Sequence, residues 1–330
     1  MIIKPKPKYA AIDVGSNTVR LLIAKINPSK QSFEPVLVER KVTRLGENFE
    51  ENRILKEIPI YRTIAALKKY KELIDDHGVK RLAVAGTAVI RESRNRDRFV
   101  SLVKEETGLP LKVISGIEEA KLSLKGVFNA ITDIDSPVLV VDIGGGSTEI
   151  VLAEPGESPM IYYTKSLPLG VVKLTEKFLK HNPPGKGACT KLGNTVSELL
   201  SRVTGEITSL YERNALSATP QTLISTAGTP TTLAAIYLEM ESYDPSKITG
   251  TRLTIQWLEN LANKLASMNL AERSKLRGLE KGREDIILAG LIILIETLKV
   301  FHLAETLVCD EGLLEGLIWD LIDWSPIVNW

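Results

Sequence analysis

Two stretches of the sequence combine an aspartate, a glycine turn and hydroxyl side chains in the same order. In each stretch an apolar run ends at the aspartate, a turn follows, and a second apolar run begins after a threonine. Such a turn can present backbone N–H groups and hydroxyls to a phosphate, while the aspartate can hold Mg²⁺ directly or through water. The residues are Asp13, Gly15, Ser16, Asn17 and Thr18 in the first stretch, and Asp142, Gly144, Gly145, Gly146, Ser147 and Thr148 in the second.

The two stretches are versions of one unit. Asp142 follows Asp13 by 129 positions, and we interpret one glycine of the second turn as an insertion that makes the offset 130 between Thr18 and Thr148. A single glycine turn in a hairpin can be merely structural, but two copies in register favour phosphate binding. An internal duplication at this distance predicts two similar domains that face each other.

Acidic and basic side chains near these turns could complete a site for phosphoryl chemistry. A carboxylate can orient or deprotonate an attacking water, and the glutamates at 118 and 119 stand at the start of an expected helix. Ser115 and Glu118 also have capping-box spacing, which explains Glu118 better than Glu119. Glu149 follows the second turn, where an unpaired carboxylate would be costly unless it met metal or solvent.

Two arginines offer planar, permanently charged forks to phosphate oxygens. Arg91 closes the motif Gly86-Thr-Ala-Val-Ile-Arg91, and its alternative role is a surface salt bridge with Glu92. Arg283 could likewise bind phosphate or form a salt bridge. Because it heads an expected helix, it could instead be needed for packing. Six basic residues lie from Lys80 to Arg98 and form a local cluster that could favour anions, but for Arg94 to Arg98 a solvated helix face is an equal alternative.

Taken together, the motifs resemble those of the exopolyphosphatase and guanosine pentaphosphate phosphohydrolase (Ppx/GppA) family, a branch of the actin-like, sugar-kinase-like superfold. Further stretches agree in the family's order and extend the similarity from about residue 9 to 318: Gly86–Arg91, Ile114–Ala120, Pro168–Gly170, Thr226–Thr229, Gly282–Asp285 and Asp310–Gly316. The resemblance is to the short form, without an added C-terminal helical domain. Leu314 stands where the family often has arginine, which removes one possible anion contact.

The resemblance implies roles for several residues. Glu119 is expected to be the catalytic base, with Arg91 steadying developing charge. Asp142 and Glu149 are expected to hold Mg²⁺ and position water, and Asp13 is a further metal ligand. Gly228, Thr229 and Arg283 would line the phosphate site together with the two glycine turns.

The expected elements alternate between strands and helices, which indicates an α/β fold. The resemblance makes this a two-domain actin-like fold with the active site in its cleft. We expect the first domain over 1–123 plus 303–330 and the second over 124–302. Strands are predicted over 9–14, 18–26, 33–42, 81–85, 111–114, from 138, 160–164, 223–226 and 305–308, and helices over 55–74, 96–106, 118–131, 170–179, 192–210, 254–268, 284–300 and 313–322.

Composition narrows the class of protein. The 330 residues carry 42 basic and 41 acidic side chains, and this balance argues against a nucleic-acid or membrane-surface binder. The longest apolar run, 286–295, is too short to span a bilayer. Cys189 and Cys309 match neither a disulfide framework nor a zinc site, and we expect a cytoplasmic protein with reduced thiols. Three histidines stand apart from one another.

We therefore expect a Mg²⁺-dependent phosphohydrolase that releases orthophosphate from inorganic polyphosphate or from the 5′-phosphate of pppGpp. Two alternatives stay open: a phosphate- or nucleotide-binding regulator with this fold and no turnover, and a kinase with an acceptor pocket. The partners are the polyphosphate or guanosine penta/tetraphosphate substrate and a second copy in a homodimer. Trp319, Trp324 and Trp330 suit core filling or a dimer contact.

Overall fold

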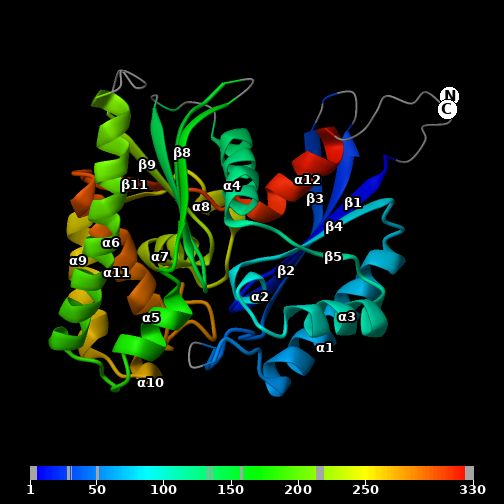
Figure 1. Ribbon diagram of the computed structural model, residues 1–330, viewed down its shortest axis with the longest axis horizontal. Helices are drawn as coiled ribbons and strands as arrows, with labels where there is room; N and C mark the ends of the chain where they lie inside the picture. Colours follow the sequence, from blue (N-terminus) through cyan, green and yellow to red (C-terminus); the bar gives the residue numbers. More distant parts are fainter. Residues whose placement is uncertain are drawn as a thin grey trace. The chain divides into compact units, whose positions relative to one another are not determined.

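The computed structural model describes residues 6–27, 30, 32–49, 52–131, 134, 137–156, 159–212 and 219–323. These residues divide into two compact units (Figure 1). The first unit contains residues 1–126 and 313–330, and the second contains residues 127–312. Trp324 and Trp330 lie outside the described residues.

The first unit is built on a five-stranded mixed sheet with the order β3-β2-β1-β4-β5. Its first three strands form an antiparallel meander, whereas β4 and β5 run parallel to β1. The elements are β1 (Lys8–Val14), β2 (Thr18–Asn27), β3 (Ser32–Val42), α1 (Glu57–Asp76), β4 (Arg81–Gly86), α2 (Ala88–Arg91), α3 (Arg96–Thr107), β5 (Leu111–Val113), α4 (Gly116–Ala130) and α12 (Leu313–Asp323).

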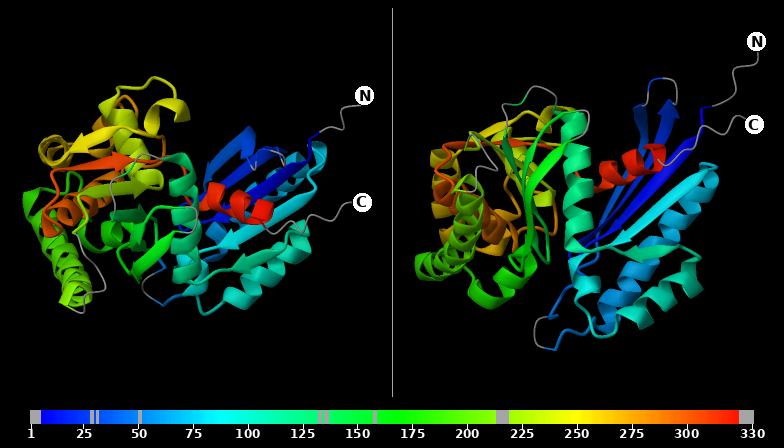
Figure 2. Two further views of the ribbon diagram at one scale, coloured as in Figure 1. Left: turned by 90° about the horizontal axis from the view of Figure 1, so that it is seen from above. Right: turned by 45° about the horizontal axis from the view of Figure 1, so that its top comes forward.

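Alternation along β1 sends side chains to both faces of this sheet. Ala10, Ile12 and Val14 join the core under α1 and α3, while Tyr9 and Ala11 join a second core with the apolar face of α12. Figure 2 shows α12 on the face opposite α1 and α3. Because both faces of β1 are covered, its end at Asp13 and Val14 is held firmly.

The second unit repeats this topology and adds one edge strand. Its six-stranded sheet has the order β10-β11-β9-β6-β7-β8, so β6, β7, β8, β9 and β11 correspond to the five strands of the first unit. The elements are β6 (Val138–Ile143), β7 (Thr148–Glu154), β8 (Met160–Leu167), α5 (Val171–Phe178), α6 (Lys186–Glu212), β9 (Thr222–Thr226), α7 (Gly228–Tyr237), α8 (Pro245–Ile248), β10 (Arg252–Thr254), α9 (Ile255–Ser267), α10 (Leu270–Arg273), α11 (Ile287–Val300) and β11 (Glu305–Val308).

Helix α11 forms the centre of the second core. Its run from Ile287 to Ile295 is buried throughout, and the helix contacts α5, α6, α7 and α9. An all-round apolar helix of 14 residues therefore serves as a core helix. Among the described residues no helix is both long enough and apolar enough to cross a membrane.

The observed division differs from the expected domain boundaries at both ends. Strand β11 pairs in parallel with β9 and antiparallel with β10, so residues 303–312 belong to the second unit and not to the first. The other boundary falls after Gly126 instead of residue 123. Helix α4 continues across that point, and no break in its sequence pattern signals the change of unit.

Candidate active site

The first glycine turn connects β1 to β2 and is braced by the segment 43–46. Within the turn, Gly15 N–H donates to the Thr18 carbonyl at 3.1 Å. The Ser16 carbonyl accepts from Gly46 N–H at 2.8 Å, and the Asn17 carbonyl accepts from two amides, Thr43 and Arg44, both at 2.9 Å. These hydrogen bonds from residues 43, 44 and 46 to the Ser16 and Asn17 carbonyls fix the conformation of the turn.

Three polar side-chain atoms in this turn are buried and have no hydrogen-bond partner among the described residues. They are Asp13 Oδ1, Ser16 Oγ and Asn17 Oδ1. A buried polar atom without a partner costs about 1–3 kcal/mol. Two of the three can only accept, which suits a cation or its bound water, and the hydroxyl can donate to a phosphate oxygen. The turn therefore offers two acceptors to a cation or its bound water and one donor to a phosphate oxygen.

Asp13 also carries a partner that the sequence reasoning did not identify. Arg20 lies opposite it in the β1/β2 register and donates to its Oδ2 from Nε at 3.1 Å and from Nη2 at 2.9 Å. The ion pair balances the charge of this buried carboxylate. Only one oxygen of Asp13 is then left to face a ligand.

The second glycine turn connects β6 to β7 and is braced by the start of α5. Gly144 N–H donates to the Ser147 carbonyl at 3.0 Å, and the carbonyls of Gly144 and Gly145 accept from Val171 and Val172 at 3.1 and 3.0 Å. A Cβ on Gly170 would lie 2.2 Å from the Gly146 carbonyl carbon, so only glycine fits there. This contact explains the motif Pro168–Gly170 as support for the turn.

The hydroxyls expected to donate to phosphate in this turn donate inside the unit instead. Ser147 Oγ donates to Glu149 Oε1 at 2.7 Å, and Thr148 Oγ1 donates to the Leu169 carbonyl at 2.6 Å. Ser166 also donates to Glu149 Oε1, at 2.6 Å. Glu149 is only 1% exposed. These bonds hold its carboxylate in one orientation and leave the glycine amides as the donors that the turn can offer.

The two turns are equal in length, which corrects the expected insertion. The bond from Gly15 to Thr18 corresponds to that from Gly144 to Ser147, so the offset stays 129 through both turns. In the register of the hairpins, Asp13 faces Arg20 and Asp142 faces Glu149. The duplicated position therefore carries a guanidinium in the first unit and a carboxylate in the second, which makes the second turn the more acidic one.

The neighbouring glutamates of α4 have different surroundings. Glu118 forms the expected capping box, in which Ser115 N–H donates to Oε2 at 2.9 Å and Ser115 Oγ accepts from Glu118 N–H at 3.1 Å. The Ser115 backbone bond, with further help from Lys112, holds the pKa of Glu118 below its ordinary value. Glu118 is exposed, and its carboxylate is used to start the helix.

Glu119, by contrast, is 8% exposed and lies beside Arg91. Arg91 Nη1 donates to Glu119 Oε2 at 2.8 Å and to the Ile114 carbonyl at 3.0 Å. The alternative partner of Arg91, Glu92, binds Arg53 Nη1 instead, at 2.6 Å. The structure thus brings together the two first-unit residues that the sequence nominated for catalysis, and it separates Glu118 from them.

Gly228 and Thr229, which were also expected to line the phosphate site, lie at the start of helix α7. Gly228 is the first residue of α7, and a Cβ there would lie 2.3 Å from Arg283 Nη2, so glycine allows the guanidinium to lie on the backbone. Arg283 also pairs with Glu280. Thr229 is 2% exposed and packs tightly against Gly290 of α11, where a Cβ would lie 2.4 Å from its methyl carbon. We find Arg283 beside Gly228, but Thr229 fills a packing position.

The described residues contain no group of three or more acidic, histidine or cysteine side chains that could hold a metal ion. Mg²⁺ commonly binds through one or two carboxylates and keeps several waters, so a site built on Asp13 Oδ1, or on Asp142 and Glu149, does not require such a group.

A comparison with known protein families shows to which family the chain belongs. The model of the Ppx/GppA phosphatase family matches residues 22–324, which is most of the chain. The chain belongs to the Ppx/GppA phosphatase family. This membership confirms the resemblance drawn from the motifs.

Individual relatives support the same family assignment. The chain is 30% identical to exopolyphosphatase 2 of Mycobacterium tuberculosis over 95% of its own length and 98% of that protein. It is 33% identical to the bifunctional 3-dehydroquinate synthase/phosphatase of Fusobacterium nucleatum over 95% of its own length, and it spans 46% of the length of that relative. The solved Ppx/GppA family member of Aquifex aeolicus is 33% identical and superimposes with a TM-score of 0.78, covering 97% of this chain and 99% of that one. The expected duplicated actin-like α/β fold is thereby confirmed.

Two residues of the candidate site were not predicted from the sequence. Arg20 follows Thr18 of the first stretch by two positions, and counting residues across the four-residue turn would have placed it opposite Asp13. Ser166 carries no motif of its own and is found only through the β7/β8 register, which pairs it with Glu149.

Proposed function

We propose that this chain is a phosphohydrolase that releases orthophosphate from the end of inorganic polyphosphate. Membership in the Ppx/GppA phosphatase family supports phosphate-ester or anhydride chemistry, and the full-length match to a protein named exopolyphosphatase 2 supports polyphosphate. The 5′-phosphate of pppGpp is the second candidate substrate, because the family's motifs are shared with guanosine pentaphosphate phosphohydrolases.

The observation that carries the proposal is the pair of the buried Glu119 and the partly buried Arg91. Water attack on a phosphoryl group needs a carboxylate close to the reacting water and positive charge close to the phosphoryl oxygens. Glu119 is the buried carboxylate at the start of α4, and the Arg91 guanidinium lies 2.8 Å from it. We assign the proton acceptor to Glu119 and charge stabilisation to Arg91.

The two glycine turns supply the proposed phosphate contacts. In the first unit the turn of Gly15, Ser16, Asn17 and Thr18 offers the side-chain oxygens of Ser16 and Asn17, which are buried and have no partner among the described residues. In the second unit the donors are backbone amides of the glycine turn, whose Gly144 and Gly145 carbonyls accept hydrogen bonds from the start of α5. Arg283, lying against Gly228, would add a further positive charge.

We also propose that the reaction uses Mg²⁺. Asp13 Oδ1 fits a cation because it is buried, acceptor-only and without a partner among the described residues. Asp142 and Glu149 face each other across β6 and β7 and are the second candidate ligands. When bound, the ion would neutralise charge on the phosphoryl oxygens.

The remaining expectations concern the whole protein. We propose that it works as a cytoplasmic homodimer and binds neither nucleic acid nor membrane. The near-balanced charge supports the second point. Light scattering coupled to size exclusion tests the dimer; a mass of 36.4 kDa, that of one chain, would contradict it.

Trp319 packs on Phe33 with ring centroids 5.0 Å apart, so this tryptophan fills the first unit.

The function is tested by measuring orthophosphate release from polyphosphate, pppGpp and ATP side by side, each with Mg²⁺ and with chelator. We expect Mg²⁺-dependent release from polyphosphate or pppGpp and little from ATP. Binding of these anions without release would support the regulator, and phosphate transfer to an added acceptor would support the kinase; either result would overturn the proposal.

A further inference from the structure

A second pocket in the second unit lies at the far end of α7, where α7 meets α9 and the segment after α10. Its volume is about 390 Å³, and its walls include Tyr237, Trp257, Lys264, Lys275 and Arg277. None of these residues belongs to the site described above. The pocket therefore needs an explanation of its own.

One wall of the pocket is aromatic. The rings of Tyr237 and Trp257 meet edge to face, with centroids 5.1 Å apart and planes at 89°. Tyr237 is 47% exposed, whereas Ile236 and Leu261, which also line the pocket, are buried. The exposed Tyr237 ring, which meets the partly buried Trp257 edge to face, offers a surface on which a planar ring can pack.

Cationic side chains also line the pocket, together with one carboxylate, that of Glu239. In the part of the chain that the structure describes, Lys264 and Lys275 have no ion-pair or hydrogen-bond partner for their ammonium groups. Arg277 pairs with Glu241 at 3.0 Å, but the two side chains are 64% and 79% exposed. Such an exposed pair contributes little and can be replaced by a stronger anion. The pocket thus has up to three positive charges against the one carboxylate of Glu239.

The segment that carries Lys275 and Arg277 is fixed by two unusual features. Arg273 is 2% exposed and donates to the Leu265 carbonyl at 3.1 and 2.7 Å and to the Glu284 carbonyl at 3.1 Å. Gly278 has φ of +79°, and a Cβ there would lie 2.1 Å from the Ala235 carbonyl oxygen. A buried guanidinium and a glycine-only contact therefore fix the segment that carries Lys275 and Arg277 against the end of α7.

The position of the pocket separates it from the phosphate segment at Gly228. Tyr237 is the last residue of α7 and Gly228 the first, so they lie about 13 Å apart along the helix at 1.5 Å per residue. One phosphate group cannot contact both ends. The pocket is a distinct site within the second unit.

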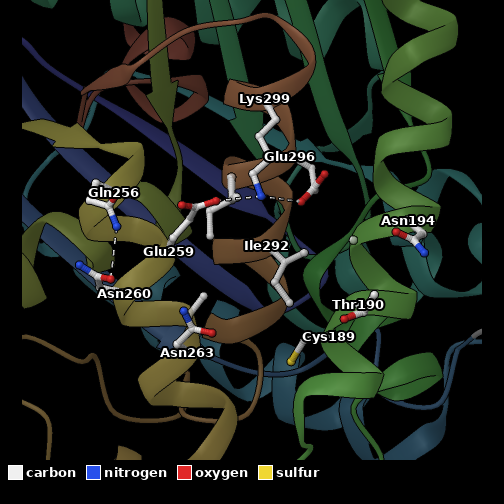
Figure 3. Close-up of a pocket in the computed structure, with 13 residues that line it drawn as sticks. Cys189, Thr190, Asn194, Gln256, Glu259, Asn260, Asn263, Ile292, Glu296 and Lys299 are labelled. Carbon is white, nitrogen blue, oxygen red and sulfur yellow. Dashed lines mark hydrogen bonds and ion pairs between the residues drawn. The ribbon is translucent and has the colours of Figure 1, made fainter.

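The groove on the other side of α9 gives a useful contrast (Figure 3). There Lys299 lies between Glu259 at 2.9 Å and Glu296 at 3.6 Å, and the remaining polar lining is mostly amide. Its single ammonium is neutralised by two carboxylates, so this groove does not attract an anion. Of the two grooves beside α9, only the one at Trp257 combines aromatic rings with unpaired cations.

We propose that the pocket at Trp257 binds a purine nucleotide. The purine packs on the exposed Tyr237 ring beside Trp257, and the phosphates bind Lys264, Lys275 and Arg277. The volume suits a molecule of this size, since ligand pockets of about 300–1,000 Å³ are typical. This site is additional to the proposed hydrolytic site and uses none of its residues.

The proposal is tested on the full chain by isothermal titration with ADP, GDP, adenosine and tripolyphosphate. We expect ADP or GDP to bind to wild-type protein, and the double variant Lys264→Ala/Lys275→Ala to bind it at least about tenfold more weakly, because two charge-assisted contacts are lost. Tyr237→Leu should weaken nucleotide binding and leave tripolyphosphate unaffected. The matched control is Lys186→Ala/Lys191→Ala, which removes two exposed charges from α6 and should bind normally.

Three outcomes would overturn the proposal. They are no nucleotide binding at millimolar concentration, equal binding by the Lys264/Lys275 variant and the control, and an oligomeric state that changes in the Lys264/Lys275 variant while nucleotide binding does not. Phosphate release from polyphosphate is measured on the same proteins and should be unchanged in both double variants. Failure of the nucleotide site and failure of the hydrolytic function are therefore seen separately.

Discussion

Replacing Glu119 by Gln tests the assignment of the catalytic base, and Glu118→Gln is its matched control. Both changes remove one negative charge and keep the size of the side chain, at adjacent positions of α4. General-base groups contribute about 10²–10⁴ in rate, which corresponds to about 3–5 kcal/mol of the barrier. We expect kcat to fall by this factor in E119Q and by less than about threefold in E118Q.

The structure predicts that neither variant is much less stable than wild type. In E119Q the amide oxygen can still accept from Arg91, so the loss is that between a charged and a neutral hydrogen bond, about 1 kcal/mol. In E118Q glutamine also suits the capping box, and the lost ion pair with Lys112 is exposed on both sides, worth about 1 kcal/mol or less. Denaturant unfolding measures both values.

Steady-state phosphate release then separates catalysis from capping. Substrate affinity of E119Q should hold or improve, because a negative charge facing an anionic phosphoryl group is gone. If E118Q proves the more damaging change, the assignment is wrong by one position. If neither change slows hydrolysis tenfold, the water-activating carboxylate must be sought at Glu149.

Three further predictions concern the turns and the ion. Gly145→Val should abolish substrate binding and leave folding intact, because a β-branched side chain would occupy the approach to the second turn; titration with a non-hydrolysable polyphosphate analogue measures this, and normal affinity would count against the phosphate role. Arg20→Met should destabilise the chain by about 3 kcal/mol or more, since Asp13 would keep a buried, unbalanced charge, and adding Asp13→Asn should recover much of the loss in denaturant unfolding; additive effects would show that the pair is not coupled. Chelation of Mg²⁺ should stop turnover with little change in the melting curve, and full activity in chelator would refute a catalytic ion.

Most strands and most helices were predictable because their signals are local, whereas the short strand β10 was not predicted. Strand β11 was predicted over the same residues as observed, and the buried helix α11 was recognisable as a long apolar run. Helix α7 was missed because Pro230 and three threonines at its start resemble a loop. Proline is tolerated in the first turn of a helix, and the helix is stabilised by packing on β9 and α11.

The site was predictable in its residue types but less so in its pairing. Asp13, Glu119 and Arg91 were found from motifs and chemistry. That Arg91 binds Glu119 and not Glu92 depends on the packing of α2 against the start of α4, which no sequence spacing gives. Ser147 was expected to donate to phosphate, and in the structure its hydroxyl donates to Glu149 Oε1 at 2.7 Å.

The most direct test of the account is to run the hydrolysis in H₂¹⁸O and to follow the label by mass spectrometry. If Glu119 activates water for attack on the terminal phosphoryl group, each released orthophosphate should carry one ¹⁸O, the shortened chain should carry none, and the E119Q protein should release labelled orthophosphate at least about a hundredfold more slowly. Unlabelled orthophosphate, label in the shortened chain, or equal rates for wild type and E119Q would contradict the central claim.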